Sequence, residues 1–171
     1  MAEAIARHVL DHQLLPVGEP TASRSAGSSD AAGTAARSDV FVASAGIAAA
    51  PGQPVSPETL VTLKARGIEH EGRSKRLTPE MIRRADLVLA MSESHVAAAR
   101  RLVAGEPQQE AKIQQLDPQR DIEDPIGLGQ AAYDGLAERL MTLLPTRLAD
   151  ALSAARPRGG AAAGGGPSSS E

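Results

Sequence analysis

Hydrophobic residues recur at helical spacing from the very start of the chain. Ile5, Val9 and Leu10 share a face with neighbouring alanines. The pattern therefore predicts a helix over about residues 1–15, ending near Pro16. No N-cap, strand or loop precedes this helix in the 171 residues. In a fold of alternating strands and helices, we expect one β-strand to be missing ahead of it.

Three short apolar runs predict the strands of a sheet, at residues 40–44, 86–91 and 111–116. The second run is apolar at successive positions, which is typical of a strand buried on both faces of a parallel sheet.

Capping signals mark several of the remaining helices. Ser56 and Thr78 each precede a proline and a glutamate, the residues that favour a helix start. Pro145 is expected to kink or divide the last helix. The predicted helices cover 57–66, a short stretch from 79, about 94–104, and 130 to about 155.

Strands that alternate with helices indicate an α/β fold with a small parallel sheet and right-handed crossovers. The length of 171 residues supports one domain, which we place at residues 1–150. Residues 17–39 are rich in glycine, alanine and serine and predict a flexible insertion. Residues 156–171 predict a disordered tail.

Composition excludes several classes of function. The chain has no cysteine, and therefore no disulfide, thiolate metal site or thiol nucleophile of its own. Its net charge of −3 gives no electrostatic reason to expect a nucleic-acid partner. It has no apolar run of the ~18 residues that span a membrane, and a cytoplasmic location is expected.

A loop of three carboxylates is the sharpest chemical signal. Asp121, Glu123 and Asp124 lie within four residues, and Pro125 and Gly127 follow. Clustering can raise a carboxyl pKa and make the group a proton donor. On spacing alone, an ordinary acidic surface turn explains the same residues more often.

Other candidate groups have weaker signals. His8 and His12 are four residues apart without a third ligand, which favours a surface pair over a zinc site. Ser44 could aim a hydroxyl at a pocket. A basic stretch could attract a phosphorylated substrate, although such runs are usually solvated; it comprises Arg66, Arg73, Lys75, Arg76, Arg83 and Arg84.

Four segments in order resemble the low-molecular-weight protein-tyrosine-phosphatase family, whose bacterial members include arginine phosphatases. They are MAEAIAR at 1–7, SAGIAAAPGQPVSPETL at 44–60, RSKRLTPEMIRRADLVLAM at 73–91 and DIEDPIG at 121–127. The resemblance implies a three-layer α/β/α fold around a parallel sheet, the phosphotyrosine protein phosphatase I fold. Its first central strand is expected to be missing from this chain.

The resemblance also implies the chemistry. A cysteine in a Cys-x5-Arg loop attacks phosphorus, and a carboxylic acid protonates the leaving group. Asp124 matches the acid position, whereas the Cys-x5-Arg loop has no match within the chain. Family members often carry a histidine shortly before the RS…LT segment, and the stretch around His70 has no clear match. No metal or other cofactor is implied.

Two functions follow from these residues. The first is a phosphoprotein phosphatase acting on phosphotyrosine or phosphoarginine, here N-terminally shortened and inactive as given. The second is a pseudophosphatase that binds or regulates without catalysis. Both hypotheses imply a phosphorylated protein as partner. Neither identifies the physiological substrate or the oligomeric state.

Overall fold

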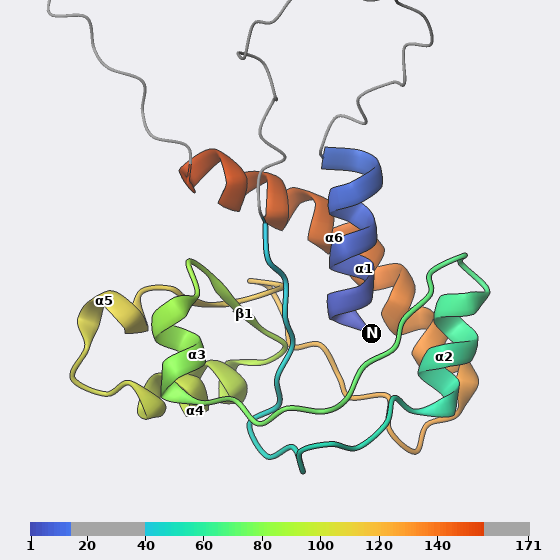
Figure 1. Ribbon diagram of the computed structural model, residues 1–171, viewed down its shortest axis with the longest axis horizontal. Coiled ribbons are helices and arrows are strands. Elements are labelled where there is room, and N and C mark those ends of the chain that lie inside the picture. The colour runs from blue at the N-terminus through green and yellow to red at the C-terminus, as the bar shows by residue number, and fades with distance from the viewer. Residues whose placement is uncertain (15–39, 156–171) are drawn as a thin grey trace, which may run out of the picture.

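The structure is a computed structural model that describes residues 1–14 and 40–155. The predicted insertion at 17–39 and the predicted tail at 156–171 lie outside these residues. The elements in chain order (Figure 1) are helix α1 (Ala2–Val9), π-helix η1 (Leu10–Leu14), α2 (Pro57–Lys64), α3 (Pro79–Arg84), β1 (Val88–Ala90), α4 (Glu93–Leu102), α5 (Pro107–Glu110), β2 (Ile113–Gln115) and α6 (Gln130–Ala155). No helix within these residues is both long and apolar enough to cross a membrane.

The described sheet has two parallel strands, β1 and β2, with Val88 opposite Ile113. The strand predicted at 40–44 is wrong, because this segment has no hydrogen-bonded neighbouring strand in the described part of the chain. Its polar backbone groups bind α1 instead. Arg7 of α1 donates to the Val42 carbonyl, and the Ser44 amide donates to Glu3.

The strands separate two hydrophobic clusters, which gives the fold its layers. Alternate residues of β1 face opposite sides: Leu89 packs against one cluster and Val88 against the other. The first cluster lies under α1, α2 and α6, and the second under α3 and α4. Figure 1 shows these two groups of helices on either side of β1. The predicted α/β class with helices on both faces is confirmed.

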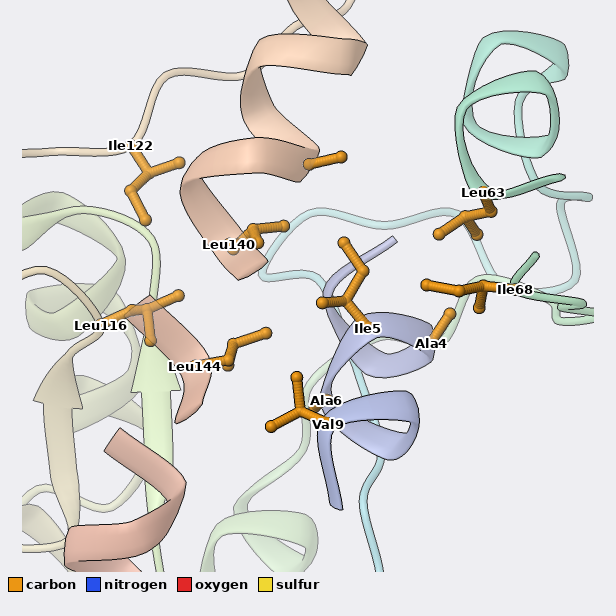
Figure 2. Packing of buried hydrophobic residues seen from close by; sticks show 11 residues of the cluster. Ala4, Ile5, Ala6, Val9, Leu63, Ile68, Leu116, Ile122, Leu140 and Leu144 are labelled. Carbon is orange, nitrogen blue, oxygen red and sulfur yellow. The ribbon is translucent and has the colours of Figure 1, made fainter. Parts of the chain in front are cut away.

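Helix α1 is the centre of the first cluster. Ile5 and Val9 have no exposed surface. Figure 2 shows α1 between Leu140 and Leu144 of α6 on one side and Leu63 on the other. The helix predicted over 1–15 is confirmed as far as Leu14, with π-helical geometry from Leu10 onward.

The predicted caps are confirmed, and of the two outcomes expected at Pro145, a division of the helix is wrong. The side chains of Ser56 and Thr78 each accept a hydrogen bond from an amide three residues on. Helix α6 runs through Pro145 without a break, although proline cannot donate to the preceding turn. The buried residues Leu140 and Leu144 hold the helix against the core on the N-terminal side of this proline.

Candidate active site

Asp124 lies in an exposed turn of the loop between β2 and α6. Its Oδ1 accepts a hydrogen bond from the Ile126 amide at 3.1 Å, and the Leu128 amide donates to the Pro125 carbonyl at 3.0 Å. Gly127 has a φ of 78°, a conformation that other residues rarely adopt. The turn therefore fixes the backbone of Asp124 while its carboxylate remains open to solvent.

The other two carboxylates of the predicted cluster have different surroundings. Asp121 Oδ1 accepts from the Glu93 amide at 2.9 Å and from Gln115 Nε2 at 2.7 Å. It thereby ties the loop to the start of α4 and to the end of β2. Glu123 is exposed. Asp121 is thus an anchor of the loop, a role that its spacing to Asp124 did not reveal.

A buried carboxylate near the start of α1 was missed by the sequence reasoning. Glu3 is 9% exposed, and its Oε2 accepts from the Ser44 amide at 2.9 Å and from the Ser44 hydroxyl at 2.7 Å. Its Oε1 accepts from Arg7 at 2.7 Å. Burial raises the pKa of Glu3, but the bonds from Ser44 and the charge of Arg7 together lower it. The Ser44 hydroxyl is therefore engaged with Glu3.

His70 reaches the same region from the loop after α2. A Cβ at Gly72 would lie 2.8 Å from His70 Nε2, so the glycine leaves room for the imidazole ring. Burial lowers the pKa of His70, and the charge of the N-terminal ammonium group lowers it further, against the opposing effect of Glu3. The charges that act on this half-buried histidine thus include that of Glu3.

The structure does not gather the predicted basic stretch into one cluster. Arg66 pairs with Asp134 on α6, and Arg83 pairs with Glu106. Arg73 and Arg76 donate to carbonyls of the 49–52 loop. These four arginines therefore hold separate parts of the fold together.

His8 and His12 form a stacked pair on the first helical segment. Their ring centroids are 4.3 Å apart, and His12 Nδ1 lies 2.9 Å from the His8 carbonyl oxygen. Within residues 1–14 and 40–155, no group of three or more potential metal ligands comes together. This arrangement is that of a surface pair.

Chemically, the arrangement offers an accessible carboxyl group on an anchored loop. Such a group can give a proton to, or take one from, a molecule that approaches from solvent. The 171 residues contain no cysteine to act as a thiolate nucleophile.

Comparisons with known proteins agree on one family. The family model described as low molecular weight phosphotyrosine protein phosphatase matches residues 33–156. A curated relative from Ralstonia solanacearum, the probable low molecular weight protein-tyrosine-phosphatase EpsP, is 34% identical over 98 residues. That match covers 56% of this chain and 66% of the relative, just under two thirds of its length.

Solved structures of similar fold include an arginine phosphatase, a YwlE mutant and a tyrosine phosphatase. The YwlE arginine phosphatase from Geobacillus stearothermophilus is 29% identical, with a TM-score of 0.64 over 90% of this chain and 83% of that one. A YwlE mutant from Bacillus subtilis is 25% identical, with a TM-score of 0.66 over 89% and 88%. The low molecular weight protein tyrosine phosphatase from T. tengcongensis is 36% identical, with a TM-score of 0.55 over 62% and 74%.

Proposed function

Because the chain belongs to the low molecular weight phosphotyrosine protein phosphatase family, we propose that it acts in hydrolysis of a phosphorylated protein, with Asp124 as the general acid. The substrate residue is phosphotyrosine or phosphoarginine, since both kinds of phosphatase occur among its relatives. The cytoplasmic location expected from the sequence stays a prediction.

The observation that carries this proposal is the setting of Asp124. Its carboxylate is exposed, while the loop behind it is tied to the sheet by the bond from the Ile122 amide to the Met91 carbonyl, 2.8 Å long. A proton donor must be both reachable by the leaving group and held in place. Asp124 combines these two properties.

In this proposal the nucleophilic cysteine comes from outside these 171 residues, because they contain none. In the mechanism that the family resemblance implies, a thiolate attacks phosphorus and the oxygen or nitrogen of the side chain leaves. Asp124 then gives its proton to that leaving group. As a carboxylate, it next takes a proton from the water that hydrolyses the cysteinyl phosphate. The chain as given is therefore expected to be inactive.

The test compares two proteins on phenyl phosphate, a phosphotyrosine peptide and a phosphoarginine peptide. The 171-residue chain is expected to show no turnover. The product that also contains the codons in frame upstream of Met1 is expected to hydrolyse at least one substrate. In that product, Asp124→Asn should lower kcat by about 10²–10⁴-fold, the usual effect of a general acid.

Glu123→Gln is the matched control, because Glu123 is the exposed neighbour of Asp124 and should leave kcat nearly unchanged. Equal losses in the two variants would refute the role of Asp124. Turnover by the 171-residue chain, abolished by Asp124→Ala, would refute the need for a cysteine from outside. A stop codon upstream without a Cys-x5-Arg segment would refute the phosphatase itself.

The second function, a binding pseudophosphatase, is favoured by the same lack of cysteine. It requires the 171-residue chain to fold cooperatively and to bind a phosphopeptide without hydrolysing it. Thermal melting followed by circular dichroism, together with calorimetric titration of a phosphotyrosine peptide, distinguishes it. A non-cooperative melt or an aggregating product would exclude a free-standing binding module.

A further inference from the structure

The loop that carries Asp124 has two halves of different character. We define the acid loop as residues 117–129, between β2 and α6. In its first half, Asp117 and Ile122 are buried at the two ends, and residues 118–121 between them are exposed. In its second half, Asp124, Ile126 and neighbouring residues are mostly exposed. The buried residues of the first half therefore anchor the loop and set the position of Asp124.

One side chain of α6 binds this first half at three points. Arg139 Nη2 lies 2.6 Å from Asp117 Oδ2 and 3.5 Å from the Arg120 carbonyl oxygen. Its Nη1 lies 3.1 Å from the Asp121 carbonyl oxygen. A planar guanidinium that binds a carboxylate and two carbonyls fixes both the place and the direction of the segment.

The ion pair at the centre of this contact is shielded from solvent. The side chains of Arg139 and Asp117 are 22% and 11% exposed. The hydrogen bond from Arg139 lowers the pKa of Asp117, and a second bond from the Gln119 amide lowers it further. The pair therefore stays charged at neutral pH. The Arg83–Glu106 pair is of similar length, 2.8 Å, but its side chains are 44% and 37% exposed, and Glu106 lies outside the acid loop.

On the side that faces α6, the acid loop borders a cleft. A cleft of about 590 Å³ is lined by residues 120–125 and 128 of the acid loop and by residues 132, 135, 136 and 139 of α6. The turn around Asp124 thus borders open space on its α6 side. Its position depends on the anchored segment that ends at Ile122, two residues before Asp124.

We infer that Arg139 is a positioning residue for the acid, because its contacts with Asp117 and with the carbonyls of Arg120 and Asp121 set where Asp124 meets the leaving group. Arg139 touches neither substrate nor reacting atoms in this role. The inference rests on the proposed function of Asp124 and adds a residue that the family motif does not contain.

The first experiment needs no turnover and uses the 171-residue chain. Amide hydrogen exchange is followed by NMR at Ile122 and Ile126, with Leu116 of the β2 end as internal reference. Arg139→Met should speed exchange at Ile122 and Ile126 by at least about tenfold and leave Leu116 unchanged. Arg147→Met is the matched control, because Arg147 of the same helix binds Gln114 and the Gln115 carbonyl rather than the acid loop.

Unchanged exchange at Ile122 in a folded Arg139→Met variant would overturn the inference. If that variant fails to fold, Asp117→Asn replaces it. The asparagine keeps an acceptor for the Gln119 amide, which lies 3.0 Å from Asp117 Oδ1, and removes the charge that Arg139 binds. The same acceleration is then expected, and its absence overturns the inference.

The second experiment uses the active, cysteine-containing product and two leaving groups. Misplacing a general acid slows a poor leaving group more than a good one. Arg139→Met should therefore lower kcat/KM, which reports the step that expels the leaving group, by about 10–100-fold for phenyl phosphate and much less for p-nitrophenyl phosphate. Arg139→Lys should recover part of the loss. Equal losses for both substrates would show a merely structural role and overturn the inference.

The two experiments separate failure of the inference from failure of the proposed function. If the unaltered product turns over neither substrate, the phosphatase function fails. The exchange measurement then still decides whether Arg139 holds the acid loop.

Discussion

Thr62 joins helices α2 and α6 through one buried hydroxyl. The residue has no exposed surface, and its Oγ1 donates to Asp134 Oδ1 and accepts from Gln130 Nε2, both at 2.7 Å. Arg66 adds bonds to the Thr62 and Asp134 carbonyls. Two helices that are distant in the sequence are thus connected by a network with one shared centre.

Thr62→Val should destabilise the chain by about 1–3 kcal/mol, because it keeps the shape of the side chain but leaves buried polar partners without their bond. Urea unfolding measures the change. Thr142→Val is the control: Thr142 is exposed and its hydroxyl binds the Glu138 carbonyl of its own helix. Equal losses in the two variants would contradict a special role for the buried network.

At this scale, the sequence does not predict which side chains bind each other when they are far apart in the chain. The sequence could place Glu3 in a first helical turn, where a carboxylate usually faces the helix dipole. It could not show that the partner is Ser44, 41 residues later. In the same way, spacing alone does not separate Asp121 from Asp124. The family resemblance selects Asp124 as the acid, and the contact with the start of α4 shows that Asp121 anchors the loop.

At the scale of elements, local sequence signals predict where helices begin, but they do not predict which segments join the sheet. Ser56 and Thr78 were identified because a cap is a contact within four residues. The apolar residues of 40–44 predict a strand, yet a strand also needs a hydrogen-bonded neighbour. The four-residue helix α5 escaped prediction because it is too short to show periodicity.

Pro145 lies inside α6, and its replacement measures how much a proline within this helix lowers the stability of the fold. Pro145→Ala should stabilise the chain by about 2 kcal/mol. Proline inside a helix costs ~3 kcal/mol, and the alanine variant loses part of this gain because its unfolded chain has more conformational entropy. The urea midpoint should rise accordingly. Pro107→Ala is the control, because Pro107 occupies the first position of α5, where no hydrogen bond is lost. Similar changes in both variants would argue against a cost inside α6.

For the whole molecule, stability should fall as acid protonates carboxylates that are bound in the fold. The pKa of Asp117 lies below its ordinary value of 3.8, and that of Glu3 below 4.5. A carboxylate whose pKa is lowered in the fold contributes fully to the stability at a pH above its ordinary pKa. This contribution is lost as the pH falls through the pKa that the group has in the folded protein. The lowered pKa of His70 acts in the same direction below 6.5.

Thermal melting between about pH 5 and pH 3 should therefore show a declining midpoint. Glu3→Gln removes one of these groups and should make the decline shallower, at the cost of a lower midpoint at neutral pH. Asp11→Asn is the control, because Asp11 is exposed. An unchanged slope in Glu3→Gln would show that Glu3 contributes nothing to the acid sensitivity.

The overall class of fold was predictable, because alternation of strands and helices is a property of the whole chain. Its layers follow from β1, where apolar residues at successive positions require cover on both faces. The number of strands was not predictable, since membership of the sheet depends on which backbone edges meet. The structure therefore confirms the architecture and corrects the sheet to two strands within its described residues.

The two hydrophobic clusters differ in how far apart their buried residues lie in the sequence. The buried residues of the second cluster all lie between Ile82 and Ile113, whereas those of the first run from Ala4 to Leu144. Closing the second cluster thus costs about 1 kcal/mol less in chain entropy than closing the first. The β1–α4–β2 unit is consequently suited to fold early and to remain intact while α1 detaches. The two faces of the sheet would then open as separate cooperative units.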